Sequence, residues 1–221
     1  MTEIRRRSWL SFALSLAVFF VAASWILHTV SRVFVVGVTE TAFMERKIAE
    51  GFEAYGGWEL LLGVHAVFAG LAILFAVLSL VASWKLWWGR HRVLGRLYGV
   101  SVLISAFAGY PLAFTATGGI VSTLGFVTLN SVWMHTVFML YRNARAREVI
   151  PHRQWAIRSF SVTMANTTLT VTSATLASLS VGHTSAYQLA VWLCLPCNLA
   201  IAEVWIWTFP KSVKSNRKLH S

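Results

Sequence analysis

The chain has 221 residues, of which 57% are hydrophobic and 12% are charged, and its formal net charge is +11. A soluble domain carries about 25% charged residues, so these charges are too few to cover a water-facing surface, and the composition excludes an ordinary soluble protein. The two cysteines are too few for a disulfide framework. The positive charge alone would suit a nucleic-acid partner, but its placement along the chain argues for a membrane topology signal and against nucleic acid.

Six apolar runs are long enough to cross a bilayer, because a transmembrane helix needs about 20 apolar residues. The first run follows three arginines, but it is about twice as long as the apolar core of a signal peptide, so we expect an uncleaved helix. The one sizeable loop, 39–57, separates the first two runs. The sequence therefore predicts an all-α fold, a single multi-pass transmembrane domain over 1–221, with helices at about 9–38, 58–84, 93–116, 120–141, 155–179 and 186–209.

Basic residues predict the orientation of this domain. Sixteen of the nineteen Lys and Arg residues fall on one side of the predicted membrane, and five of the eight glutamates fall on the other. The positive-inside rule puts the basic side, and with it both termini, in the cytoplasm. We also expect this side to contact anionic lipid headgroups.

Histidines within or beside the predicted spans are the main candidate site residues, because ionisable groups in lipid are costly and usually functional. At a rise of about 1.5 Å per residue, His28 and His65 lie at a similar depth below the outer surface, on consecutive helices. His91 and His152 each begin a helix at the inner surface. His135 lies in the inner part of the fourth predicted span.

Two histidines at one depth on facing helices are what axial ligation of a b-type haem requires. The sequence predicts His28 and His65 as outer ligands of haem iron, and His91 and His152 as inner ligands. Two such haems would carry electrons across the membrane to a redox partner. In the plainer interpretation, each neutral imidazole hydrogen-bonds a hydroxyl or carbonyl group, or faces water at the interface.

Two related sequence motifs, which we call phrases, lie at the inner surface. Each starts a helix with His-Arg and has another arginine one to two turns later. Helix N-termini favour anions such as phosphate or carboxylate, so the phrases are candidates for binding a charged head group. Equally, their arginines can extend to lipid phosphates. The phrases are His91-Arg92 with Arg96, and His152-Arg153 with Arg158.

A carboxylate within the sixth predicted span, Glu203, is the basis of an alternative to the haem interpretation. It can donate a proton, or it can pair with Arg96 or Arg158. The first case predicts a membrane-embedded non-redox enzyme that acts on a lipid or prenyl-type substrate in lipid or terpenoid biosynthesis, with Glu203, Arg96 and Arg158 as catalytic residues. A small carrier or an accessory subunit is a third interpretation.

The fifth and sixth predicted spans carry two further patterns. Hydroxyl and amide side chains recur every three or four residues in the fifth span and form one stripe, which either packs against another helix or lines a cavity. Cys194 and Cys197 have a redox-type spacing, but burial in an apolar span disfavours the thiolate, and Pro196 between them predicts a kink. The stripe is Ser159, Thr163, Asn166, Thr170 and Ser173.

The same residues carry a resemblance to a known family. From about 55 to 205 the chain resembles the DUF2306 family of predicted membrane proteins, a likeness that implies a compact helical bundle. More distantly, histidines on successive helices resemble the cytochrome b561 architecture, in which four helices bind two haems. The family pattern also has an arginine deep in the fifth span, where this chain has Thr168-Leu169-Thr170. The matching residues are His65, Gly70, the phrase from His91 to Tyr98, the phrase from His152 to Arg158, and 198–203.

Overall fold

A computed structural model of the chain describes residues 45, 47–49, 51–53, 56–84 and 87–208. Four helices of this part are long and apolar enough to cross a membrane: α3, α4, α5 and α8. The predicted all-α membrane class is therefore confirmed, whereas the six-span count and the orientation stay predictions, since 9–38 and both termini lie outside the described residues. The helices are α3 (Trp58–Trp84), α4 (Trp88–Ala113), α5 (Gly119–Arg145), α6 (Val149–Thr163), α7 (Ala165–Ser178) and α8 (His183–Thr208).

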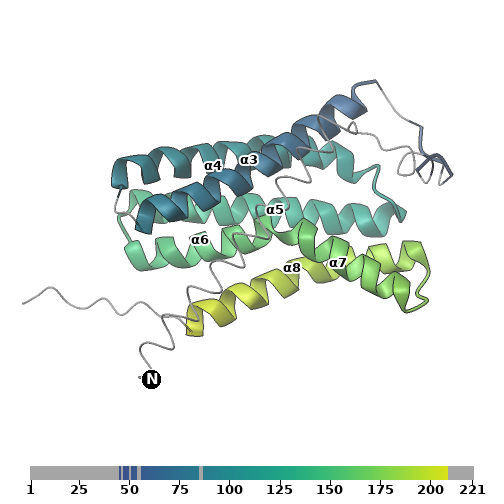
Figure 1. Ribbon diagram of the computed structural model, residues 1–221. Helices are drawn as coiled ribbons and strands as arrows, with labels where there is room; N and C mark the ends of the chain where they lie inside the picture. Colours follow the sequence, from purple (N-terminus) through teal and green to yellow (C-terminus); the bar gives the residue numbers. More distant parts are fainter. Residues whose placement is uncertain (1–44, 46, 50, 54–55, 85–86, 209–221) are drawn as a thin grey trace, which may run out of the picture.

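Helices α3 to α6 form a four-helix bundle. α3 packs against α4 and α6, and α5 packs against the same two helices, so α4 and α6 lie at opposite corners, as do α3 and α5. The α3–α4 and α5–α6 connections lie at one end of the bundle, on the left in Figure 1. We call it the inner end, because it carries most of the arginines. α8 packs along α6 and α7.

The two hairpins of the bundle repeat each other at a spacing of 61 residues. α3 begins at Trp58 and α5 at Gly119, and both helices have 27 residues. α4 then begins at Trp88 and α6 at Val149, again 61 residues apart. Because both hairpins start at the outer end, an axis along the bundle relates them, and equivalent side chains of α4 and α6 can meet at that axis.

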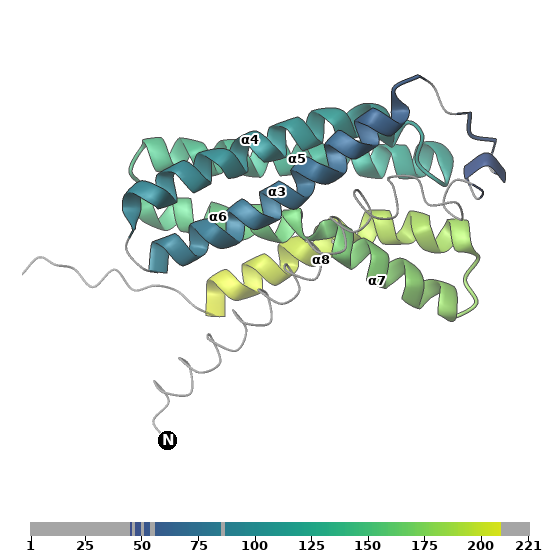
Figure 2. The same cartoon turned by 45° about the horizontal axis from the view of Figure 1, so that its top comes forward.

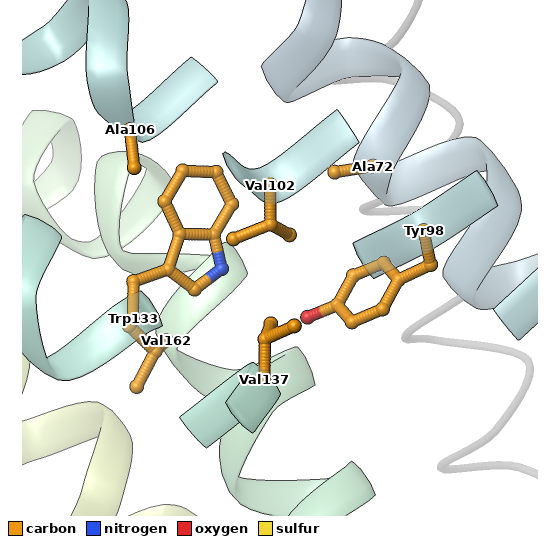
Figure 3. Packing of buried hydrophobic residues seen from close by; sticks show 7 residues of the cluster. All are labelled: Ala72, Tyr98, Val102, Ala106, Trp133, Val137 and Val162. Atoms are coloured by element: carbon orange, nitrogen blue, oxygen red, sulfur yellow. The ribbon is translucent and has the colours of Figure 1, made fainter. Parts of the chain in front are cut away.

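The centre of the bundle shows such a meeting. The hydroxyls of Tyr98 and Ser159, which are equivalent in the repeat, share a hydrogen bond of 2.6 Å. Thr163 Oγ1 lies 2.9 Å from the Tyr98 hydroxyl and accepts a hydrogen bond of 2.9 Å from Trp133 Nε1. In Figure 3 the Tyr98 hydroxyl and the Trp133 indole nitrogen face the same space beside Val137. These bonds satisfy polar groups that lipid would leave unpaired.

The prediction of one continuous helix over 155–179 is wrong. α6 ends at Thr163 and α7 starts at Ala165. The Thr163 hydroxyl donates to the backbone carbonyl of Ser159, 2.8 Å away, and back-bonding of this kind bends helices. The Met164 N–H is shared between two carbonyls, those of Phe160 and Ser161. As a result α7 leaves the line of α6, as Figure 2 shows, and packs against α8.

The break also divides the predicted polar stripe. Ser159 is buried and Thr163 half-buried, and both bond within the bundle, as the packing interpretation expects. Beyond the break, Asn166 and Thr170 are exposed and Ser173 is half-buried.

Candidate functional site

Two histidines meet at the inner end. His91 lies in the first turn of α4 and His152 in the first turn of α6. Their ring centroids are 6.2 Å apart and their planes stand at 89°. A metal bonded to one nitrogen of each ring at about 2.0–2.1 Å places the centroids about 5 to 6.5 Å apart. The spacing therefore fits a single metal shared by the two rings.

The hydrogen bonds of the two rings leave one nitrogen of each available. His91 Nδ1 lies 2.9 Å from the Ser79 hydroxyl and 3.0 Å from the Ser79 carbonyl oxygen. His152 Nδ1 lies 3.1 Å from the carbonyl oxygen of Leu140. Because a carbonyl only accepts, each Nδ1 carries the proton and each Nε2 keeps its lone pair. Metal-ligating histidines are oriented by such carbonyl bonds.

The environment of His152 favours the neutral form of its ring. Burial lowers the pKa of His152; the bond to the Leu140 carbonyl acts in the opposite direction, and the neighbouring His91 adds to the lowering. A neutral imidazole is the form that binds metals. The ring can therefore act as a ligand at neutral pH.

The surroundings of the pair are basic. Arg92 and Arg153 directly follow the two histidines, and the Trp88 ring meets His91 edge-on at 6.3 Å. One turn along each helix the repeat places Gly95 and Ala156. A methyl group added at Gly95 would meet Ser79 Oγ at an ordinary 4.0 Å. Within the described ranges, three or more His, Cys or acidic residues gather nowhere.

The predicted outer pair is only partly described. His65 lies in the outer half of α3, where its Nδ1 is 2.9 Å from the Ser105 carbonyl oxygen and 3.1 Å from the Ser105 hydroxyl. His28, its predicted partner, lies outside the described residues, so the outer haem stays a prediction. His135 is exposed on α5 and meets the Trp155 ring edge-on at 5.6 Å.

The predicted catalytic carboxylate is paired. Arg158 donates from Nε to Glu203 Oε1 over 2.6 Å and from its NH2 group to Oε2 over 3.1 Å, and its guanidinium lies 4.8 Å from the Trp155 ring centre. The ion pair joins α6 to α8, as the plainer interpretation of Glu203 expects. Arg96 is exposed on α4. The geometry therefore links two of the three predicted catalytic residues and leaves Arg96 on the surface.

Sequence reasoning missed the groups that orient the histidines. Ser79 and the Leu140 carbonyl each lie 12 residues before the histidine that they bond. The signal that could have found them is the 61-residue spacing of the two His-Arg phrases, which implies equivalent neighbours. Asn130, a polar residue within α5, was also missed.

Comparison with known families matches residues 62–206 to the family described as "Predicted membrane protein (DUF2306)". The chain belongs to the DUF2306 family. The matched residues contain α4 to α7 and almost all of α3 and α8, and so the histidine pair and the Arg158–Glu203 pair. No curated protein and no solved structure matches the chain. The resemblance to cytochrome b561 stays a prediction.

Proposed function

We propose that this DUF2306 protein is a transmembrane electron-transfer protein that binds one b-type haem at the inner end of its bundle. His91 and His152 would hold the haem iron. The observation that carries the proposal is their 6.2 Å centroid separation together with the carbonyl bonds of both Nδ1 atoms. An outer haem on His28 and His65 is not needed for it.

The charge of the inner end favours haem over a bare metal ion. Haem carries two propionates, and its iron is neutralised by the porphyrin dianion, so the whole group is anionic. Arginine binds carboxylates in a fixed, charge-assisted geometry, and Arg92 and Arg153 directly follow the two ligands in the sequence. A bare divalent cation would instead be repelled by these arginines.

Each residue of the site has a physical task in this proposal. Ser79 and the Leu140 carbonyl hold the proton on Nδ1, which leaves the Nε2 lone pair of each ring available to the iron. Gly95 and Ala156 place small residues one turn along each helix from the two ligands. The apolar core around Trp133 keeps water from entering further. When bound, haem supplies reversible one-electron transfer.

A reduced-minus-oxidised visible spectrum of the purified full chain from haem-replete cells tests this proposal. We expect a Soret band and sharp α-bands that are lost in His91→Ala and in His152→Ala. The matched control is His135→Ala, which removes an exposed histidine and should keep the bands. His65→Ala should also keep the bands of the inner haem. A folded but colourless wild-type protein would contradict the proposal.

The lipid- or prenyl-directed enzyme receives less support from the described contacts. It requires a transferable proton on Glu203, and two hydrogen bonds from Arg158 favour the ionised carboxylate. If Glu203→Gln or Arg96→Ala altered the lipid or terpenoid profile of the cell while His91→Ala did not, the enzyme interpretation would replace the haem proposal.

A further inference from the structure

A largely buried amide in the outer half of the bundle makes no hydrogen bond with the described residues. Asn130 on α5 is 6% exposed, and no residue of the described ranges bonds its side chain. It lies 11 residues from the outer start of α5, which is a depth of about 16 Å. Water is scarce at that depth, so an unpaired amide is unfavourable there. Such a group calls for a bound partner.

His65 presents an unpaired nitrogen in the same region. Its Nδ1 lies 2.9 Å from the Ser105 carbonyl oxygen, so Nδ1 carries the proton and Nε2 keeps its lone pair. The Ser105 hydroxyl donates to the His65 carbonyl over 2.9 Å, which anchors this part of α3 on α4. Within the described ranges, no group donates to His65 Nε2.

The two side chains converge over one glycine of α4. A Cβ atom added at Gly109 would lie 2.8 Å from Asn130 Nδ2 and 3.1 Å from His65 Nδ1. The two nitrogen atoms are therefore less than 6 Å apart, although α3 and α5 occupy opposite corners of the bundle. A side chain at Gly109 would have to displace the Asn130 amide and the His65 ring.

We infer that His65 and Asn130 bind the hydroxyl group of a membrane-soluble alcohol or phenol. A hydroxyl is the simple group that satisfies both at once: its O–H donates to His65 Nε2, and its oxygen accepts from the Asn130 amide. A carbonyl ligand would leave His65 Nε2 unpaired. The position within the hydrocarbon region selects a ligand that dissolves in lipid. The inference stands independently of the haem proposal.

Binding of trimethylhydroquinone and of its dimethyl ether to the full chain in nanodiscs tests the inference, because the ether keeps the ring and lacks the O–H donor. We expect the hydroxylated probe to bind at least tenfold more tightly than the ether. Asn130→Leu and His65→Phe should each abolish that preference. The matched control is His135→Phe, which should retain it.

Equal binding of the two probes, or an unchanged preference in Asn130→Leu, would overturn the inference and assign the two polar groups to an ordered water molecule. A second measurement needs no variant: the 15N shift of His65 Nε2 should move when trimethylhydroquinone is added, and an unmoved shift overturns the inference equally. His91→Ala separates the two proposals, because it should remove haem and leave the preference for the hydroxylated probe intact.

Discussion

The 61-residue repeat brings equivalent residues together at the inner end of the bundle but not in its outer half. At the inner end, equivalent residues face each other: His91 meets His152, and deeper in the bundle Tyr98 bonds Ser159. In the outer half, His65 instead faces Asn130. The position equivalent to His65 is Phe126, whose ring packs against Tyr187 of α8 with centroids 6.1 Å apart.

The bend after α6 explains this difference. α4 continues as one helix to Ala113, whereas its counterpart stops at Thr163 and continues as α7 along α8. The symmetry therefore holds where both hairpins are regular and ends where the second one turns away. A pseudosymmetric pair suits one shared metal group, and the asymmetric outer half suits a smaller, polar ligand.

The largest effect is expected from an ion pair that only the second hairpin has, since the position equivalent to Arg158 is Leu97. Arg158→Ala leaves the Glu203 carboxylate without its partner. Because Glu203 is 42% exposed, we expect a loss of about 2–3 kcal/mol in the free energy of unfolding, below the value for a fully buried pair. Denaturation in mixed micelles measures it.

The controls for that change are Arg96→Ala, an exposed arginine of the first hairpin, which should stay within about 0.5 kcal/mol of wild type, and the double variant Arg158→Leu with Glu203→Leu. The double variant should recover most of the loss. No recovery would mean that packing, not charge, holds α6 to α8.

A methyl group added to α4 should change the stability of the protein differently in the outer half of the bundle and near its centre. Gly109→Ala brings Cβ against Asn130 and His65, which must move, and we expect a loss of about 2 kcal/mol. Gly99→Ala meets Val137 at an ordinary 3.5 Å and should be neutral, or stabilising by up to about 1 kcal/mol. Melting temperatures of the two variants measure the contrast, and equal values would contradict the tight outer contact.

Tyr98→Phe tests the bond between equivalent residues at the centre. It removes the hydroxyl that bonds the buried Ser159 and the half-buried Thr163, and both lose a partner, so we expect a loss of about 1.5 kcal/mol. The control is Tyr110→Phe, whose hydroxyl bonds Ser131 at an exposed position and should matter by less than about 0.5 kcal/mol. Indistinguishable variants would contradict a central role for this bond.

Ser79→Ala should have the smallest effect, because it removes only the hydroxyl contact to His91 and keeps the carbonyl contact. It makes the two histidines alike in their hydrogen bonding. We expect haem affinity to fall about threefold, less than when a sole orienting group is lost. Haem titration of the apoprotein measures this, with Ser83→Ala, whose hydroxyl bonds the Leu80 carbonyl within α3, as the unaffected control.

The helices themselves were largely predictable. The second predicted span, 58–84, coincides with α3. Its long apolar run begins after Gly56-Gly57 and ends at a segment rich in Trp and Lys, and such a run predicts a single transmembrane helix. α4 and α6 begin five and six residues before the predicted 93 and 155, since polar residues at the interface can join a helix without entering the hydrocarbon region. A prediction based on the length of the apolar run alone leaves such residues out of the helix.

The site was predictable only in part. His91 and His152 were paired from their depth alone, and the structure brings them into contact. The partnership of Glu203 with Arg158 and not Arg96 depends on which faces α4, α6 and α8 present to one another. The approach of Asn130 to His65 depends on Gly109, which belongs to a third helix.

By itself the sequence determined that lipid surrounds this protein, the lengths of its apolar helices and the side of the membrane on which its charges are expected. The free energies of burying apolar side chains in lipid and of keeping charges out of it depend on each segment separately. The tertiary structure decided which histidines meet, where the second hairpin bends and which arginine pairs with Glu203. Those outcomes depend on helix neighbours and on hydrogen bonds between segments far apart in the chain, which no single segment encodes.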